Sequence, residues 1–269
     1  QDLCSSILGF ANDQSLKMKS RELEALISEF ISLQNEGASS SDKLQSTAFS
    51  SIVSCVFHSN KIEFAGMSTE RETGELVERY LSRREESRQQ QHYLNSYETA
   101  EREVIQMFQL FQSTVRSSDL HTRNSRAFHM DCNVFKQWHK MLFDGILDDA
   151  GEFRIDGRQT TTMSGDRHVF PHHTIVKKSL SNLCLLLNDC RREVMSKYQE
   201  NQNRVLFSFA LAAFAQFHFV DIHPFSDGNG RMCRLISKRF VDWVCPVPFP
   251  QFTVSRDIYL RTVNECRWE

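Results

Sequence analysis

The stretch from His223 to Arg234 reads His-Pro-Phe-Ser-Asp-Gly-Asn-Gly-Arg-Met-Cys-Arg and gathers residue types that bind phosphate. Gly228 and Gly230 let the main chain come close to a ligand, so that successive N–H groups can face one anion. If a helix begins near Gly230, its unpaired N–H groups and positive dipole end add to that site. Arg231 and Arg234 stand three residues apart, so both can lie on one side of the first turn and form a fork for phosphate oxygens.

Two further residues of this stretch suit chemistry on a polyphosphate. Asp227 supplies one hard oxygen ligand, which suits a Mg²⁺ held mostly by water and nucleotide phosphates. The ordinary pKa of a histidine side chain is close to neutrality, so His223 can take a proton from an attacking hydroxyl. The alternative is a tight turn, because Asp-Gly and Asn-Gly are also strong hairpin signals. A plain turn gives no reason for a histidine, a carboxylate and two arginines to converge, so the residues favour a polyphosphate site.

The elements on both sides of this stretch are predicted to be helices. Apolar residues recur there every three or four positions, which is the spacing of a helix rather than of a strand. They are Val205, Phe209, Ala212, Ala213 and Phe219 before the stretch, and Met232, Leu235, Ile236, Phe240 and Trp243 after it. The stretch is therefore expected to be a loop between two helices.

At every fixed position the stretch resembles the signature of the Fic family, His-x-Phe-x-Asp/Glu-Gly-Asn-Gly-Arg-x-x-Arg. Three other segments resemble parts of that family. Phe135-Lys-Gln-Trp-His139-Lys-Met-Leu resembles the helix that opens the core, and Gly151-Glu-Phe-Arg154 resembles the start of the substrate-docking flap. Cys245-Pro-Val-Pro248, followed by Arg256 and Tyr259, resembles the segment after the catalytic helices. The resemblance extends from about Ser46 onward.

The resemblance implies a mainly helical fold, a helical bundle with a short β-hairpin flap over the active site. It implies an N-terminal helical extension over residues 1–45 and a Fic domain over residues 46–269. Within that domain it places an inhibitory helix at about 46–64 and the catalytic loop at 223–234. Apolar spacing independently predicts a helix over Leu16–Leu33 and another over Leu44–Phe57.

The function that the resemblance implies is protein adenylyltransferase, the transfer of AMP from ATP to a Ser, Thr or Tyr hydroxyl of a target protein. His223 would be the general base, and Asp227 would hold Mg²⁺ between the α- and β-phosphates. Phe225 would be a wedge that anchors the loop in the core. Gly228, Asn229 and Gly230 would form the anion hole, with the Asn229 side chain on phosphate oxygens. Arg231 would bind phosphate near the leaving group, and Arg234 would pair with the γ-phosphate.

A built-in inhibitor is also implied. Ser59-Asn-Lys-Ile-Glu63-Phe64 resembles the family's inhibitory helix, Ser/Thr-x-x-x-Glu-Gly/Asn, whose glutamate pairs with the second arginine of the signature. Here that pair would be Glu63 with Arg234, and a carboxylate in a guanidinium fork must leave before a phosphate can bind. Phe64 departs from the pattern where Gly or Asn is usual. The alternatives are an ordinary surface glutamate, or a glutamate that positions water for the removal of AMP.

A hairpin is predicted over Arg158–Asp166, because threonines there favour strands and Ser164-Gly165-Asp166 is a turn signal. The resemblance makes this hairpin the flap, and a protein target would dock near Thr160–Ser164 by strand addition. A plain surface hairpin is the alternative. The histidines that follow, His168, His172 and His173, lack the spacing of a zinc motif.

Net charge, the length of apolar runs and the spacing of cysteines limit which class of protein this can be. A net charge of −2 over 269 residues gives no basic field for nucleic acid, and no apolar run approaches the ~20 residues of a membrane span. Eight cysteines without Cys-x-x-Cys spacing indicate free thiols and a cytoplasmic compartment. Gln1 is not an initiator Met, so the possibility of an upstream targeting segment stays open. The possibility of a homodimer stays open as well.

Two segments complete the expectations. Met67–Gln91 is rich in charges and is expected to be either a solvated helix or a mobile connection, and Arg256–Asn264 is expected to start a final helix. Two other classes of function stay open beside AMP transfer. They are an AMP-removing or bifunctional enzyme, and a non-catalytic interaction domain that binds a nucleotide.

Overall fold

The computed structural model describes residues 41–86, 97–116, 129–162, 165–197, 201–243 and 255–265, with isolated positions at 25, 28, 29 and 32. These residues form eight helices and one two-stranded sheet, which confirms the prediction of a mainly helical fold with a short hairpin. Three predicted features lie outside the described residues: the helix over Leu16–Leu33 as a whole, most of the extension over 1–45, and Cys245–Pro248.

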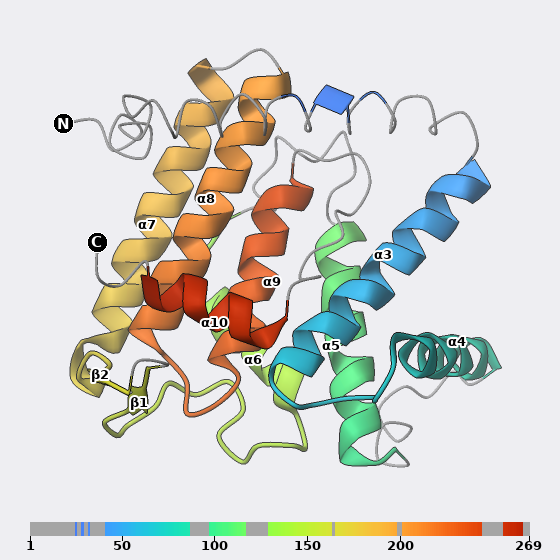
Figure 1. The fold of residues 1–269 in the computed structure, drawn as a ribbon, viewed down its shortest axis with the longest axis horizontal. Coiled ribbons are helices and arrows are strands. Elements are labelled where there is room, and N and C mark those ends of the chain that lie inside the picture. Colours follow the sequence, from blue (N-terminus) through green and yellow to red (C-terminus); the bar gives the residue numbers. More distant parts are fainter. Residues whose placement is uncertain are drawn as a thin grey trace.

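The elements are labelled as in Figure 1. The helices are α3 (Ser41–Ile62), α4 (Glu70–Glu86), α5 (Thr99–Arg116), α6 (Cys132–Phe143), α7 (His173–Lys197), α8 (Asn201–Ile222), α9 (Asn229–Asp242) and α10 (Arg256–Glu265), and the strands are β1 (Gln159–Thr161) and β2 (Arg167–Val169). The predicted loop joins α8 to α9, as the apolar spacing indicated. Within the charged segment predicted over Met67–Gln91, Glu70–Glu86 forms the helix α4, and residues 87–91 lie outside the described part of the chain.

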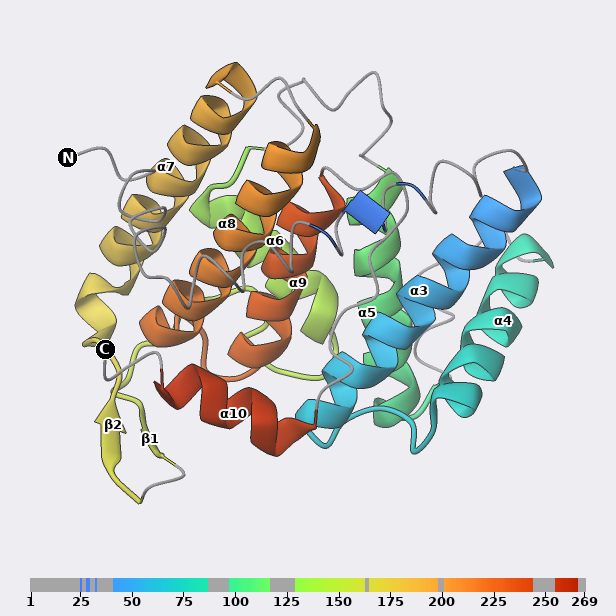
Figure 2. The same ribbon diagram turned by 45° about the horizontal axis from the view of Figure 1, so that its top comes forward.

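The helices form a bundle with α9 at its centre. One side of α9 packs against α8, which packs in turn against α7, and the other side meets α3 and α5. Helix α4 covers α3 and α5 from outside, and α10 lies across the ends of α8 and α9 close to the hairpin (Figures 1 and 2). Because α9 follows the motif loop directly, the loop is attached to the most buried helix of the fold.

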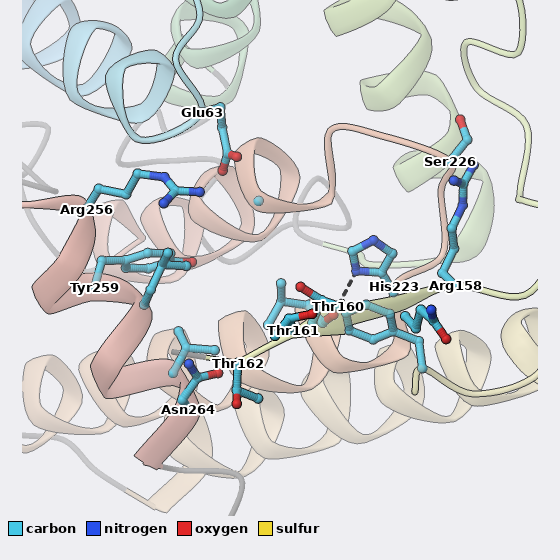
Figure 3. A pocket seen from close by; sticks show the side chains of 16 residues that line it. Glu63, Arg158, Thr160, Thr161, Thr162, His223, Ser226, Arg256, Tyr259 and Asn264 are labelled. Carbon is cyan, nitrogen blue, oxygen red and sulfur yellow. Dashed lines mark hydrogen bonds between the residues drawn. The ribbon is translucent and has the colours of Figure 1, made fainter. Parts of the chain in front are cut away.

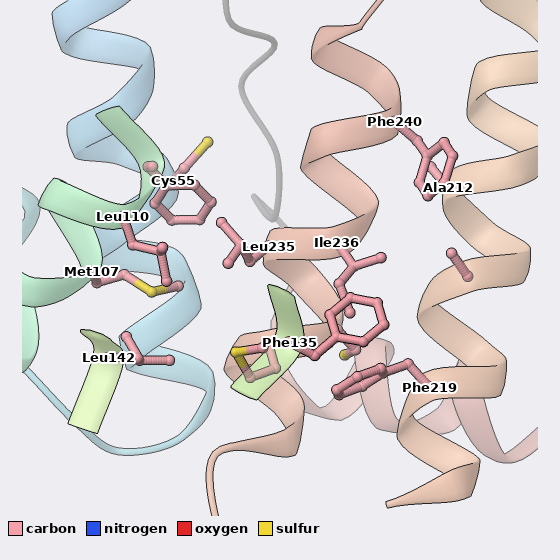
Figure 4. Packing of buried hydrophobic residues seen from close by; sticks show 14 of the residues in the cluster. Cys55, Met107, Leu110, Phe135, Leu142, Ala212, Phe219, Leu235, Ile236 and Phe240 are labelled. Atoms are coloured by element: carbon pink, nitrogen blue, oxygen red, sulfur yellow. The ribbon is translucent and has the colours of Figure 1, made fainter. Parts of the chain in front are cut away.

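The hydrophobic core surrounds α9 and extends under the motif loop. Leu235 and Ile236 on α9 are fully buried, and Phe219 from α8 packs edge-on against Phe135 from α6 with ring centroids 5.3 Å apart (Figure 4). Helix α6 begins at an N-cap, in which the Asp131 side chain accepts the N–H of Val134 at 2.8 Å. This packing fixes the elements that carry the site.

The hairpin is antiparallel, with Thr160 opposite His168 and Thr161 opposite Arg167, and all three residues of β1 are exposed. Residues 163 and 164, part of the predicted docking segment, lie outside the described residues. Within the described part of the chain, none of the helices has the length and apolar character to cross a membrane.

Candidate active site

A cavity of about 560 Å³ lies where the loop after α8, the hairpin, α10 and the end of α3 meet. Its walls include His223 from the loop, Thr160 from the hairpin, Tyr259 from α10 and Glu63 from the end of α3 (Figure 3). The structure thus brings the predicted base, the predicted flap and the predicted inhibitory glutamate to one cavity.

His223 is the first residue after α8 and has a left-handed backbone, with φ 52°. Its ring stacks on Phe170, with centroids 3.9 Å apart and planes 19° apart. Its Nδ1 lies 3.3 Å from the carbonyl oxygen of Val220. Because a carbonyl only accepts, Nδ1 carries the proton in this arrangement and Nε2 is the acceptor, as a general base requires.

Arg154 forms hydrogen bonds with the backbone of the motif loop. This buried side chain donates to the carbonyl oxygens of His223 and Pro171, both at 2.5 Å, and of Asp156 at 2.6 Å. Its main-chain N–H also donates to the carbonyl of Pro224 at 3.0 Å. Burial lowers the pKa of Arg154 from its ordinary value. One guanidinium therefore ties the flap segment to the residue that would act as base.

Phe225 and Asn229 close the loop internally. The Phe225 ring is fully buried, as expected of a wedge. The Asn229 side chain accepts the N–H of Phe225 at 3.0 Å and donates to its carbonyl at 2.8 Å. Both polar ends of this amide are thus engaged by the loop, so the Asn229 side chain fixes the shape of the loop backbone. Its contact with a phosphate stays a prediction.

His139 on α6 supports the loop from the core side. It stacks on Phe225 at 3.8 Å, with planes 8° apart. The N–H of Gly151 donates to its Nδ1 at 2.8 Å, so the proton is on Nε2, which lies 3.1 Å from the carbonyl oxygen of Asp227. Burial lowers the pKa of His139 to about 4, so the ring is neutral at pH 7.

The first turn of α9 presents its N–H groups at the loop. Gly228 is the N-cap with φ 74°, and no side chain caps the helix. A Cβ at Gly228 would lie 2.1 Å from the Phe143 ring, so only glycine fits. The exposed carboxylate of Asp227 accepts the N–H of Gly228 at 2.6 Å. A helix N-terminus without a side-chain cap, beside one hard oxygen donor, is suited to a phosphate with a divalent cation.

Glu63 and Arg234 form an ion pair of 2.7 Å between Oε1 and Nη2. Arg234 is fully buried and also donates to Ser59, from Nε to the hydroxyl at 3.0 Å and from Nη2 to the carbonyl at 2.9 Å. Burial opposes the charge of Arg234, but the attraction of Glu63 outweighs it, so the pKa of Arg234 is raised. The three residues named from the inhibitory pattern are therefore in direct contact.

The Glu63 carboxylate also covers Gly230. A Cβ built at Gly230 would lie 2.0 Å from Oε1 of Glu63. Glu63 lies against the first turn of α9, where a bound phosphate would approach the N–H groups. The Glu63 carboxylate thus occupies space beside Gly230, in addition to pairing with the Arg234 guanidinium.

Arg231 has a carboxylate partner that the sequence did not indicate. Its side chain is buried and pairs with Glu103 on α5, at 2.8 Å between Nη1 and Oε1, while its guanidinium lies 4.4 Å from the centre of the Phe143 ring. Arg234 meets a different carboxylate, Glu63, so each arginine of the predicted fork is paired with its own acid. Each is drawn to an acid on a different helix packed against α9.

Phe64 ends α3 in a backbone form that glycine usually supplies. The N–H of Ala65 donates to the carbonyl of Asn60 at 3.0 Å, and that of Phe64 donates to Lys61 at 3.2 Å, which is the Schellman pattern. Phe64 stands at its left-handed position with φ 55°. The departure from the family pattern therefore falls on the residue that turns the chain after Glu63.

Sequence reasoning missed Glu103, and it missed the role of Arg154. The motif Gly151-Glu-Phe-Arg154 marked the flap segment without indicating that its arginine binds the loop. Nothing near Glu103 in the sequence distinguishes it from Glu101, the other glutamate of α5. Only the packing of α5 on α9 shows its role.

Residues 129–241 match the family model of the Fic/DOC family. A Fido domain-containing protein of Dictyostelium discoideum is 27% identical over 121 residues, which are 45% of this chain and 73% of that protein. The ribonucleoside-diphosphate reductase small chain of Ostreid herpesvirus 1 (isolate France) is 25% identical over 140 residues, 50% of this chain and 22% of the viral protein. The match thus spans less than a quarter of that viral protein.

Solved structures share the fold. Fic-1 from C. elegans has a TM-score of 0.61 at 16% identity, over 99% of this chain and 71% of that chain. A Fic family protein from Desulfovibrio desulfuricans G20 has a TM-score of 0.59 at 20% identity, over 92% of this chain and 66% of that chain. With the family model covering α6, the hairpin and the motif loop, residues 129–241 of this chain form a domain of the Fic/DOC family.

Proposed function

We propose that this chain is a protein adenylyltransferase, which transfers AMP from ATP to a Ser, Thr or Tyr hydroxyl of a target protein. The observation that carries the proposal is the position of His223. Its ring lines the cavity with Nε2 as the acceptor, next to the first turn of α9, which presents N–H groups for phosphate. Base and anion site are thus side by side, as in-line transfer of a phosphoryl group requires.

In the proposed reaction, His223 Nε2 takes the proton of the target hydroxyl. The hydroxyl oxygen forms a bond to the α-phosphorus, the bond from that phosphorus to the bridging oxygen breaks, and pyrophosphate leaves with the electron pair. The N–H groups of Asn229 and Gly230 and the positive end of α9 would stabilise the charge on the phosphate oxygens. Arg154, by holding the His223 carbonyl, keeps the base in place.

Asp227 fits the Mg²⁺ that such a reaction uses. Its carboxylate is exposed beside the α9 N-terminus, and within the described ranges no group of three acidic, His or Cys side chains gathers into a cation site. A single carboxylate suits a cation held mainly by phosphates and water. When bound, Mg²⁺ would neutralise phosphate charge.

We propose that Glu63 restrains this activity. Its carboxylate pairs with Arg234 and covers Gly230, so the γ-phosphate of ATP would have to displace it from both. Because Arg234 is fully buried, solvent reaches the pair only from the side of Glu63, whose side chain is 33% exposed, and weakens it less than a surface ion pair. ATP would bind in an unproductive pose while Glu63 stays in place.

The hairpin is the proposed docking edge for the target. Strand β1 is exposed, and strand addition along Thr160 and Thr161 would bring an extended segment past His223. The hairpin is tied to the site, because His168 lies 3.1 Å from Asp221 at the end of α8 and Phe170 stacks on His223. The docking edge and the base therefore keep a fixed relation.

A second candidate is the removal of AMP from a modified target. Glu63 is favourable for it, because its side chain is 33% exposed and lines the same cavity as His223. A carboxylate placed there could orient a water molecule toward the phosphorus. The two reactions differ in whether Glu63 is needed or must be absent.

One labelling experiment separates these functions. The chain is incubated with Mg²⁺ and ATP labelled at the α-phosphate, as native protein, as Glu63→Gly, and as Glu63→Gly with His223→Ala. We expect weak self-labelling of the native chain, a strong rise in Glu63→Gly, and loss when His223 is also replaced. ATP labelled at the γ-phosphate serves as the control, since transfer of that label would indicate a kinase instead.

The labelled Glu63→Gly chain is then isolated and used as substrate. Release of AMP by the native chain, but not by Glu63→Gly, would establish removal as an activity of the site. A folded Glu63→Gly chain that binds ATP without any labelling would support the non-catalytic interaction domain and refute AMP transfer.

A further inference from the structure

Glu103 joins the first arginine of the motif loop to the turn that follows the inhibitory helix. Its Oε1 pairs with Nη1 of Arg231 at 2.8 Å, and its Oε2 accepts the N–H of Gly66 at 3.2 Å. Gly66 has φ 74° and packs closely against Asn60 and Val104, so this N–H has a fixed position. One carboxylate on α5 therefore has both oxygens engaged across two other segments.

The surroundings of Arg231 leave its guanidinium one orientation. Exposure of the side chains is 5% for Arg231 and 13% for Glu103, so the pair is largely shielded from water. The Phe143 ring covers one face of the guanidinium. Arg231 Nε is buried and has no hydrogen-bond acceptor within the described residues. This unpartnered donor belongs to a residue in the first turn of α9, next to the proposed phosphate site.

We propose that Glu103 is a positioning residue for Arg231 in the transfer reaction, which rests on the function proposed above. Glu103 touches neither nucleotide nor target. It anchors one edge of the guanidinium, so that the positive charge and the remaining donors of Arg231 stay directed at the start of α9 when pyrophosphate departs. An arginine held in advance loses no orientational freedom in the transition state.

A carboxylate is needed for this because both partners donate. Glutamine at position 103 has the same shape, but it offers one acceptor oxygen and one NH₂ group, so either Arg231 or Gly66 must face a donor. In Glu103→Gln the guanidinium of Arg231 loses the carboxylate that fixes its orientation, while its own positive charge remains to attract ATP. The expected effect is thus on turnover rather than on nucleotide affinity.

The kinetic test uses the full chain in the Glu63→Gly background. Glu103→Gln is expected to lower kcat for AMP transfer at least about tenfold, with KM for ATP changed less than about threefold. The matched control is Glu101→Gln, on the same helix, where the glutamate lies 3.7 Å from Arg79 and away from the loop. It is expected to leave both constants unchanged. An unchanged or higher kcat in Glu103→Gln, or a loss that appears equally in Glu101→Gln, would overturn the proposal.

A second readout does not depend on turnover. The Nη protons of a fixed arginine give resolved NMR signals, and those of a rotating arginine average. We expect the Arg231 signals to be resolved with Glu103 and averaged in Glu103→Gln, while Arg234 stays resolved wherever Glu63 is kept. Resolved Arg231 signals in Glu103→Gln would refute the positioning role.

The two readouts separate this inference from the function on which it rests. If Glu63→Gly transfers no AMP, the proposed function fails, and the NMR experiment alone decides whether Glu103 positions Arg231. If Glu103→Gln does not fold, Glu103→Asp replaces it in both experiments. That variant keeps the charge but withdraws the carboxylate by one methylene, so it is expected to show the same loss of kcat to a smaller degree.

Discussion

The guanidinium of Arg256 lies over the ring of Phe64, with Cζ 4.8 Å from the ring centre. The same arginine donates from Nε to the carbonyl of Ile62 at 2.8 Å, so it holds the end of α3 at two points. Phe64 itself is 84% exposed and is held in a left-handed backbone. The turn after Glu63 is thus stabilised by a contact from α10, not by the backbone preference of its own residue.

The backbone strain at Phe64 can be measured by comparing two substitutions. Phe64→Gly and Phe64→Ala both remove the ring from Arg256, but only glycine adopts the left-handed form without cost. We expect Phe64→Gly to be more stable than Phe64→Ala by about 1 kcal/mol in urea unfolding. Equal stabilities would show that the turn relaxes without strain.

Arg256 is expected to help hold Glu63 in place. Arg256→Gln should raise AMP transfer by the chain that keeps Glu63, because the end of α3 loses both contacts, and should have little effect in the Glu63→Gly background. The measurement is a double-mutant cycle on initial rates. Arg261→Gln, also exposed on α10, is the control. A similar change in both backgrounds would place the role of Arg256 in nucleotide binding instead.

His139 should make stability depend on pH. Its pKa in the folded chain is about 4, below the ordinary 6.5, so the unfolded chain binds the proton more readily between these values. The contribution of His139 to the free energy of unfolding is therefore fully present above pH 6.5. It is lost as the pH drops toward 4, by up to about 3 kcal/mol. The check is urea unfolding at pH 7.5 and pH 5 for the native chain and His139→Gln. His58 and His218, whose pKa values burial also lowers, remain in both chains, so the difference isolates His139.

Arg154 should be more sensitive to a conservative change than a surface arginine. Lysine cannot reach the carbonyls of His223, Pro171 and Asp156 together, so Arg154→Lys is expected to cost about 2–3 kcal/mol of unfolding free energy. In the Glu63→Gly background it should also lower AMP transfer by at least about tenfold, because the base loses its support. Arg192→Lys, at an exposed pair with Asp189, should change stability by less than about 0.5 kcal/mol. If Arg154→Lys lost no more unfolding free energy than Arg192→Lys, the contacts assigned to Arg154 would be contradicted.

The part of the site that the sequence predicted is the part that local pattern determines. The loop between α8 and α9 follows from apolar spacing and glycines within a few residues of His223. The meeting of Glu63 with Arg234 came from a family resemblance, since no local signal joins residues so distant in the chain.

Glu103 and Arg154 were not predicted because their roles arise only from tertiary packing. Glu103 is 128 residues from Arg231, and Arg154 is 69 residues from His223. Each would be an unremarkable charged residue in another fold. The separate acid partners of Arg231 and Arg234 were not predicted for the same reason, because three-residue spacing allows one shared direction but neighbouring acids decide which direction each side chain takes.

Gly230 connects the chemistry of the site to its evolution. Its φ is not left-handed, so glycine is required there for space alone, and that space is filled by the Glu63 carboxylate. Positions 63 and 230 should therefore vary together among relatives. A side chain gained at position 230 would displace the Glu63 carboxylate and also fill the volume of the proposed phosphate site, so selection on the proposed restraint and on the proposed reaction would act on the same glycine.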